Sequence, residues 1–455
     1  MTGSPSALSR RAALGAGAAA LAFAALPAAA QSVTGALSAA AQGVKPDAPG
    51  DQSAALQRAI AAAVKARLPL YLPPGSYRAT GLDLSAGAGL VGVPGATRLL
   101  LSGTGPLIAA QGGEGLRLEG LTLDGSGFSI PDGSGLIALA RCAGIRIRDC
   151  VLTASAGHGI ALAGCGGEVA NCRIATAAKT GLFAIDSTGL AIRANEFRDI
   201  GNNAVQVWRS QIGDDGTLVL GNRISRVAAN DSGDGQNGNG VNVFRAGNVI
   251  VADNRIADCA FSAVRGNAAS NLMIRGNNCS TLGETGLYAE FGFHGAIISA
   301  NVVENAVNGI AVTNFDQGGR LAVVEGNIVR NMLVKAPPDY DSPISDGIGI
   351  SVEADTAVTG NVVENAPKIG IRVGFGAFAR NVAVVGNVVR NAGVGIGAAI
   401  VDGAGDVLIA DNLVTGAKLG AVVGLEWNKP ATGDLAGPNP GPLPLNLAVS
   451  GNRVR

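Results

Sequence analysis

An asparagine-led repeat constrains the fold of this 455-residue chain more than any other sequence feature. Each unit is an Asn followed by apolar residues and often preceded by Gly, as in the G-N-V-V segments at 360–363 and 386–389. Most intervals between successive units are close to one another in length, and the few longer intervals fit the same unit with an added loop. The repeating residues are Asn195, Asn222, Asn254, Asn277, Asn301, Asn327, Asn361, Asn387, Asn412 and Asn452.

The unit predicts a coil of short strands joined by tight turns. Val and Ile favour pleated strands, and Gly and Asn tolerate the left-handed backbone of turns. Stacked coils would place each leading Asn over its counterpart, so that the amides form a ladder. The chain lacks the spacing of leucine-rich repeats and the large blades of a propeller. We therefore predict an all-β fold, a right-handed parallel β-helix in which each coil packs on its neighbours.

The entrance to this solenoid has a different pattern. Residues 31–80 are expected to form a cap, with a helix over 51–67 followed by a strand and a Pro-Pro-Gly turn. The apolar positions of that helix recur at helical spacing, at Leu56, Ile60 and Val64. Such a helix would cover an open sheet edge that could otherwise pair with another chain. The β-helix should then occupy 81–455, with a Pro-rich loop near 428–445.

The segment 1–30 is typical of an export signal. Arg10 and Arg11 precede an apolar run from Ala12 to Leu26, and small residues of the A-x-A kind follow at 28–30. The paired arginines favour the twin-arginine export machinery over the general secretory route. We expect a periplasmic or secreted protein, with no membrane span in its mature part.

Together these segments resemble a known superfamily. The stretches G-V-K-P-D, D-Q-S-A-A-L-Q-R-A-I and L-P-L-Y-L-P-P-G-S-Y are similar to the start of pectate-lyase-like β-helix proteins, which include pectate lyases, polygalacturonases and phage tailspike depolymerases. The twin-arginine signal with asparagine-led repeats resembles a bacterial family of twin-arginine-translocated repeat proteins. The resemblance covers nearly the whole chain and implies the β-helix fold. The resemblance does not imply a particular activity.

Alternation along each coil predicts one outward face with two rows of comparable positions. The first row is Gln206, Asn242, Arg265, Tyr288, Ala311, Ser351 and Arg372. The second row is Trp208, Phe244, Asn267, Glu290, Thr313 and Glu353. Aromatic residues make up only 4% of the chain, yet Trp208, Phe244, Tyr288, Phe291 and Phe293 gather here. Aromatic rings beside amides and charged groups suit a sugar-binding groove, whereas the alternative is an ordinary solvated sheet face.

Catalytic groups are sought on the same face. Glu290 is the preferred acid, with Asp316 or Glu353 as its partner, because a hydrolase needs two facing carboxylates. Arg265, Arg245 or Arg320 could act as a lyase base or clamp a carboxylate, and His294 is the better placed of the two histidines. The polygalacturonase signatures are absent in order, so we interpret Gly157-His158-Gly159 as a turn.

Two further groups of residues leave alternatives open. The loop at 230–239 holds Asp231, Asp234, Asn237 and Asn239, whose oxygens could bind calcium, but a plain loop is favoured and we assign no metal ligand. Among the six cysteines, Cys142 and Cys165, like Cys150 and Cys172, lie one repeat apart. These pairs could form disulfides between coils or act as small core side chains. No C-x-x-C motif supports zinc, haem or iron–sulfur binding.

The sequence thus supports two functions. The first is an exported protein that binds a polysaccharide or oligosaccharide and cleaves it as a lyase or hydrolase. The alternative is a non-catalytic glycan-binding or structural scaffold protein in the periplasm or at the surface. The 34 basic and 34 acidic residues balance, so no net charge points to nucleic acid as a partner.

Overall fold

A typical coil of the chain consists of three short strands joined by tight turns. In one coil, β11 (Ile145–Arg148), β12 (Val151–Ser155) and β13 (His158–Ala163) follow each other, and β14 (Gly167–Ala170) begins the next coil beside β11. The computed structural model describes residues 35–232, 235–336 and 346–455. The predicted signal at residues 1–30 lies outside the described residues.

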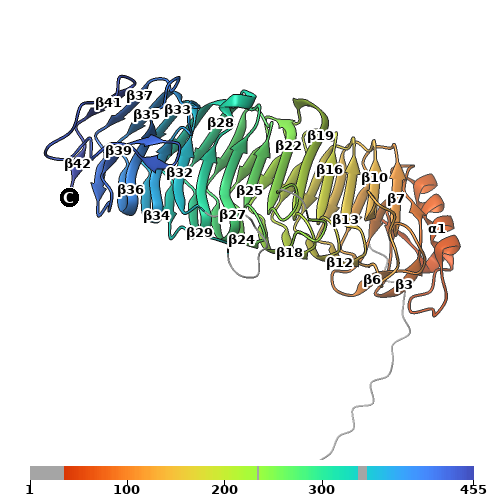
Figure 1. Cartoon of the computed structure of the whole chain (residues 1–455). Helices are drawn as coiled ribbons and strands as arrows, with labels where there is room; N and C mark the ends of the chain where they lie inside the picture. The colour runs from red at the N-terminus through yellow and green to blue at the C-terminus, as the bar shows by residue number, and fades with distance from the viewer. Residues whose placement is uncertain (1–34, 233–234, 337–345) are drawn as a thin grey trace, which may run out of the picture. The chain divides into compact units, whose positions relative to one another are not determined.

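The strands of the described residues form a 16-stranded sheet, here called sheet A, and a 26-stranded sheet. The larger sheet bends into two faces: face 1 contains the strands that follow sheet A in each coil, such as β12, and face 2 contains the next strands, such as β13. Neighbouring coils pair in parallel along the molecule (Figure 1). This arrangement confirms the predicted right-handed parallel β-helix.

Face 2 carries most of the predicted site, and its strands can be followed from one coil to the next. Its described strands include β7 (Ile108–Gln111), β10 (Gly135–Ala140), β13, β16 (Leu182–Ile185), β19 (Val205–Asp214), β22 (Val241–Gly247), β25 (Val264–Asn267), the second halves of β27 (Asn278–Glu290) and β29 (Val302–Val312), β32 (Ile348–Val352), the second halves of β34 (Val362–Val373) and β36 (Val388–Ala399), and β39 (Val422–Glu426).

An asparagine ladder fills the corner between sheet A and face 1, as predicted. Each Asn side-chain oxygen accepts the Nδ2 group of the Asn one coil earlier, at 2.9 to 3.1 Å from Asn195 to Asn452. It also accepts the backbone N–H of that earlier Asn, as between Asn277 and Asn301 at 2.9 Å. At the N-terminal end, the N–H of Cys172 donates to Asn195 at 2.8 Å, so Cys172 occupies the next rung.

Left-handed residues make the bend between face 1 and face 2. Asn305, Asn331, Asn365 and Asn391 have φ between 55° and 59°. Most residue types avoid this conformation, whereas Asn adopts it at low cost. The second asparagine of the repeat therefore marks this bend.

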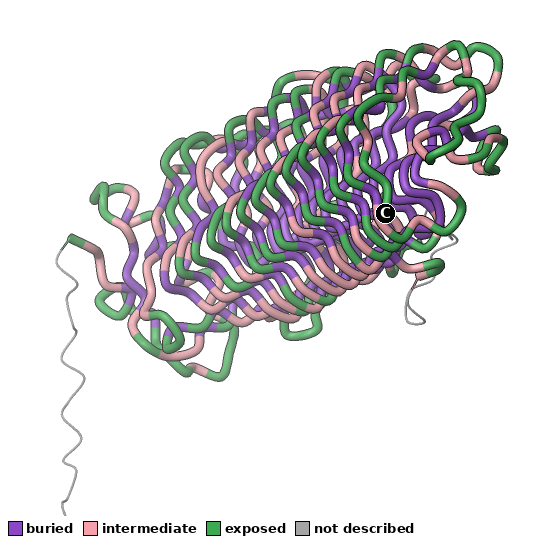
Figure 2. Tube along the Cα trace, turned by 90° about the vertical axis from the view of Figure 1, so that its left-hand side faces the viewer, coloured by how far each residue is buried: buried purple, intermediate pink, exposed green. Residues whose placement is uncertain are grey.

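The interior of the coils is one continuous apolar core of stacked Val, Ile, Leu and Ala side chains. Figure 2 shows buried backbone running through the inside of the stack, with exposed residues at its corners. The six cysteines are buried free thiols. Cys150 stacks on Cys172, because the strands that follow them pair Val151 with Arg173.

The helix α1 (Ser53–Ala66) lies at the N-terminal end of the stack (Figure 1). It buries Leu56, Ala59, Ile60 and Ala63. Asp51 accepts the N–H of Ser53 at 2.9 Å ahead of the first turn. The helix expected over 51–67 is thus present but begins at Ser53, and of its expected apolar positions Leu56 and Ile60 are buried whereas Val64 is half-buried.

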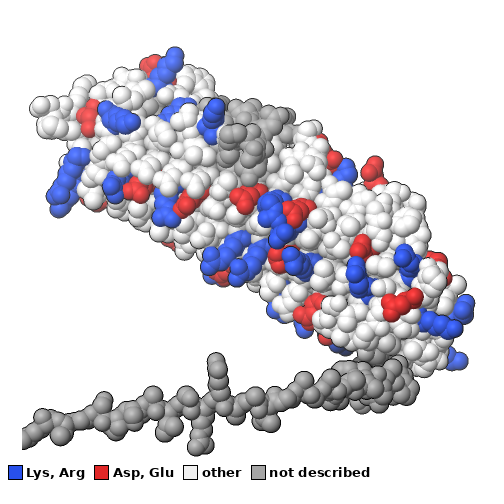
Figure 3. Space-filling view, turned by 90° about the horizontal axis from the view of Figure 1, so that it is seen from below, with Lys and Arg blue, Asp and Glu red and all other residues white. Residues whose placement is uncertain are grey.

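Charges on face 1 pair between coils. Arg226 contacts Asp199, Arg330 contacts Glu304, and Arg390 contacts Glu364. Basic and acidic side chains lie interspersed on the side of the molecule seen in Figure 3.

Candidate functional site

The strand register aligns the two predicted rows on face 2. In the first row, Phe183, Gln206, Asn242, Arg265 and Tyr288 lie opposite each other on successive coils. In the second row, the corresponding residues are Ile185, Trp208, Phe244, Asn267 and Glu290. Residues far apart in the sequence thus lie one coil apart, because a parallel solenoid brings equivalent positions into contact.

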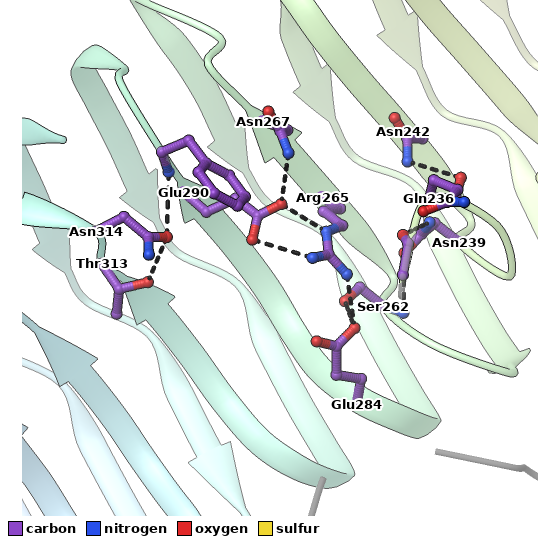
Figure 4. A network of polar contacts seen from close by, with 12 residues as sticks. Gln236, Asn239, Asn242, Ser262, Arg265, Asn267, Glu284, Glu290, Thr313 and Asn314 are labelled. Atoms are coloured by element: carbon purple, nitrogen blue, oxygen red, sulfur yellow. Dashed lines mark hydrogen bonds and ion pairs between the residues drawn. The ribbon is translucent and has the colours of Figure 1, made fainter. Parts of the chain in front are cut away.

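Arg265 is the centre of a buried ionic cluster, shown in Figure 4. Its Nε and Nη2 groups donate to the two oxygens of Glu290 at 2.7 and 3.0 Å. Its Nη1 group donates to Glu284 at 3.0 Å. The side chains of Arg265, Glu284 and Glu290 are only 10%, 4% and 2% exposed. One guanidinium therefore holds two carboxylates in fixed positions.

Neighbouring polar groups complete the cluster. The amide of Asn267 donates to Glu290 at 3.0 Å, and the hydroxyl of Ser262 donates to Glu284 at 3.4 Å. The Arg265 guanidinium also lies 5.2 Å from the centre of the Tyr288 ring. Both carboxylates are thus hydrogen-bonded, which buried charges require.

Glu284 is the carboxyl that sequence reasoning missed. Burial raises its pKa to about 7, and the neighbouring Arg265 only partly opposes this shift. The residue lies in the bend of β27, where the register against β29 is irregular between Leu282 and Thr285. Alternation along the strand could not locate its side chain there.

A loop covers the cluster. The backbone of Gly235 lies so close to Arg265 that a Cβ atom at this position would overlap the guanidinium. Asp231 anchors the loop through Lys179, at 2.6 Å, and Asn202, at 2.7 Å. The carbonyl of Gln236 accepts the amide of Asn242 at 3.2 Å. The loop therefore shields Arg265 from solvent.

The described residues considered for calcium have other partners. Asn237 donates to the carbonyl of Ser232, and Asn239 is buried against Asn203. Asp234 lies outside the described residues. In the described parts of the chain, no group of three His, Cys, Asp or Glu side chains is arranged to hold a metal ion.

An aromatic row extends from the cluster toward the N-terminal end of face 2. The ring centres of His158 and Phe183 lie 5.0 Å apart, those of Phe183 and Trp208 5.7 Å, and those of Trp208 and Phe244 5.4 Å. Arg245 lies 4.6 Å from the centre of the Phe244 ring. The indole N–H of Trp208 donates to Asn242 at 3.0 Å. We call His158, Phe183, Trp208 and Phe244 the aromatic row.

His158 is not the turn residue that we expected. It begins strand β13, where its Nδ1 atom accepts the backbone N–H of Thr180 at 3.1 Å. Burial, assisted by the charge of Lys179, lowers its pKa to about 4. A neutral, stacked His is therefore part of the aromatic row.

Beyond the N-terminal end of the aromatic row, face 2 is hollowed. Outward Ala138, Ala140, Ala161 and Ala163 form the floor of a cavity of about 240 Å³, with Phe183 among its lining residues. The small alanine side chains on its floor account for this hollow.

Several predicted residues lie apart from the Arg265 cluster. His294 and Arg320 begin strands β28 (His294–Ser299) and β30 (Arg320–Glu325), which pair within sheet A. Phe293 is fully buried, whereas Phe291 is 39% exposed. Asp316 lies in the short helix η2 (Phe315–Gln317).

Glu353 and Arg372 lie farther toward the C-terminal end of face 2. Glu353 accepts the N–H of Phe315 at 2.7 Å, and burial raises its pKa. Arg372 donates to Ser351 at 3.0 Å. The structure thus brings together Arg265, Asn267, Tyr288 and Glu290 of the predicted residues, but not His294 or Arg320.

Comparisons with known proteins agree on the fold. The family model described as "Right handed beta helix region" matches residues 107–224 and 136–318. No curated protein sequence matches the chain.

Solved structures with a similar fold have low sequence identity. The N-terminal fragment of bacteriophage phi29 gene product 12 is 16% identical, with a TM-score of 0.53 over 92% of this chain and 70% of that chain. The catalytic unit of the GH87 α-1,3-glucanase from Streptomyces thermodiastaticus is 18% identical, with a TM-score of 0.45 over 94% and 70% of the two chains. PfbA, a surface adhesin of Streptococcus pneumoniae, is 15% identical, with a TM-score of 0.46 over 85% and 91%. At these identities the likeness concerns the fold, and function must be argued from the site.

Proposed function

We propose that this protein binds an extended glycan lengthwise along face 2. The observation that carries the proposal is the aromatic row, in which Phe183, Trp208 and Phe244 form ring contacts across successive coils. Aromatic rings can pack on the apolar faces of sugars.

The surroundings of the aromatic row favour binding as its main role. The alanine-floored hollow lies at one end of the row, and the Arg265 cluster lies at the other. Glu284 and Glu290 are almost fully buried and are both engaged by Arg265. In this state the cluster is better suited to hold the groove in shape than to contact a glycosidic bond.

Cleavage is the second candidate function, and Glu284 is the observation in its favour. A carboxyl whose pKa is raised to about 7 can donate a proton near neutral pH. Glu290, on the other side of the same guanidinium, would be the second carboxylate that a hydrolase needs. Movement of the loop around Gly235 would have to expose both groups.

A binding panel tests the first proposal. Purified protein lacking residues 1–30 is run in native gels that contain neutral or uronate polysaccharides, with and without calcium. We expect retardation by at least one polysaccharide, and loss of roughly tenfold or more in affinity for a Trp208→Ala, Phe244→Ala double variant. Leu408→Ala removes an exposed apolar side chain from sheet A and serves as the control. Equal affinity of the double variant and the control would refute glycan binding by the aromatic row.

Turnover is measured with the same panel. Ultraviolet absorbance detects the unsaturated products of a lyase, and a reducing-end assay detects hydrolysis. Glu284→Gln and Glu290→Gln should each abolish turnover but retain binding if the chain is an enzyme. Binding without either product would favour the scaffold function.

We also propose export by the twin-arginine route to the periplasm or beyond. Arg10 and Arg11, the apolar run to Leu26 and the small residues at 28–30 support this proposal. No helix in the described ranges has the length and apolar character of a membrane span. An Arg10→Lys, Arg11→Lys variant should accumulate inside the cell, whereas unchanged export would exclude the twin-arginine route.

A further inference from the structure

Arg372 lies on the same face as Arg265 but belongs to a separate group of residues. Going along the first row, Arg265 pairs with Tyr288, Tyr288 with Ala311, Ala311 with Ser351, and Ser351 with Arg372. Four steps of about 4.8 Å place the two arginines about 19 Å apart along the stack. Arg372 is therefore outside the Arg265 cluster.

The hydrogen-bond partners of Arg372 are neutral. Its Nε group donates to the hydroxyl of Ser351 at 3.0 Å, and its Nη1 group donates to the side-chain oxygen of Asn428 at 2.9 Å. Arg265, by comparison, is bonded to two carboxylates. These two bonds fix the position of the Arg372 guanidinium without neutralising its charge.

The carboxylates near Arg372 are engaged by other groups. Asp346 forms an ion pair with Lys368 at 2.7 Å. Glu353 accepts the backbone N–H of Phe315 at 2.7 Å. Within the described ranges, no carboxylate lies at ion-pair distance from Arg372. Burial lowers the pKa of Arg372, although both carboxylates partly oppose this effect, and a desolvated charge without a counter-ion is costly.

One aromatic ring lies beside the guanidinium, and a second ring contacts the first. The centre of the Phe375 ring lies 5.5 Å from it, and Phe375 meets Trp427 edge-on with ring centres 5.1 Å apart. Residue Trp427 is 53% exposed. The site thus combines a positioned cation with an accessible aromatic surface, and Nη2 makes no hydrogen bond to a described residue.

We propose that Arg372, Ser351, Asn428, Phe375 and Trp427 form a carboxylate-binding site. A carboxylate would accept hydrogen bonds from the guanidinium and supply the missing negative charge. The body of the ligand would then lie against Trp427. This site does not depend on the proposed glycan groove, because it shares no residue with the aromatic row or the Arg265 cluster.

The two tryptophans of the chain, Trp208 and Trp427, allow a direct test. In a Trp208→Phe background, Trp427 is the only indole, and its fluorescence is followed during titration with acetate, glucuronate and glucose. We expect acetate or glucuronate to change the emission saturably and glucose to leave it unchanged. A response to both acids indicates a general carboxylate site, and a response to glucuronate alone indicates an acidic sugar.

Charge variants decide whether Arg372 is responsible. Arg372→Gln should raise the Kd for the responding acid at least tenfold, and Arg372→Lys should raise it less. Arg390→Gln removes an exposed arginine from face 1 and should change nothing; circular dichroism checks that every variant is folded. If glucose responds as well as the acids, if no ligand responds, or if folded Arg372→Gln or Arg372→Lys binds like the parent, the proposal is wrong.

Discussion

Arg265 and Glu290 form a two-bond ion pair between adjacent coils, with Nε–Oε1 and Nη2–Oε2 distances of 2.7 and 3.0 Å. The pair is almost fully buried, although both residues lie on the outward side of face 2. Because the partners belong to different strands, β25 and β27, only the coil register brings them together. The geometry of the candidate site thus depends on the register between adjacent coils.

Removing Arg265 should destabilise the protein strongly. Arg265→Gln would leave the Glu284 and Glu290 carboxylates without their shared cation, at an expected cost of about 3–5 kcal/mol in the free energy of unfolding. Urea denaturation measures this cost. Arg390→Gln, which breaks an exposed pair with Glu364, should cost at most about 1 kcal/mol. Similar small losses for both variants would contradict a structural role of the cluster.

The covering loop can be tested at Gly235. Gly235→Ala should displace the loop or Arg265, because the new methyl group would overlap the guanidinium. Gly318 is a matched control, because its φ of 92° is close to the 96° of Gly235 and nothing lies within 4 Å of its Cβ position. Both variants carry backbone strain, so the extra destabilisation of Gly235→Ala reports the overlap. Faster proteolysis within 230–240 should accompany this destabilisation. Equal destabilisation by Gly235→Ala and Gly318→Ala would argue against close packing of the loop on Arg265.

Glu284 should make stability depend on pH. Its pKa is about 7 in the folded protein and 4.5 ordinarily, so the folded state holds the proton more tightly. The stabilisation from this proton is complete below about pH 4.5 and is lost as pH rises through 7. Wild-type protein should therefore lose stability relative to Glu284→Gln between these pH values, as measured by urea denaturation. A difference that does not vary with pH would contradict the raised pKa.

Among the residues at the corner between sheet A and face 1, the ladder asparagines should be those whose substitution lowers the free energy of unfolding most. Asn301→Ala would remove the acceptor of the Asn277 backbone and amide groups, both of which are buried. Each of these two unsatisfied groups costs about 1–3 kcal/mol, so we expect a loss of about 2–6 kcal/mol. Thermal and urea unfolding provide the measurement. Gln317→Ala, at an exposed side chain, should stay within about 0.5 kcal/mol, and an equally small effect of Asn301→Ala would show that the ladder is dispensable.

Much of the fold could be predicted because the spacing of the repeat indicates which residues of successive coils lie side by side. The leading asparagines fix one corner, and alternation after each Gly-type step fixes which residues point outward. The predicted alignment of Arg265 with Tyr288 and of Asn267 with Glu290 followed from this pattern.

The errors arise where the chain leaves the pattern. Glu284 lies in a bend, where alternation fails. His294 follows Glu290 closely in sequence, but the chain turns at Phe291, whose φ is 58°, and enters sheet A. The interpretation of His158 as a turn residue rests on the missing polygalacturonase signatures. Its flanking glycines instead let strands approach closely, because a Cβ at Gly159 would overlap Ile174 and the carbonyl of Gly181.

The most direct test of the central claim follows the emission of Trp208 while the protein binds a glycan. A Trp427→Phe variant leaves Trp208 as the only indole and removes the reporter of the Arg372 site. Titration with the polysaccharide that retards the protein most in native gels should change the emission with the same midpoint as binding. If the polysaccharide binds and the emission of Trp208 does not change, the aromatic row is not the binding surface.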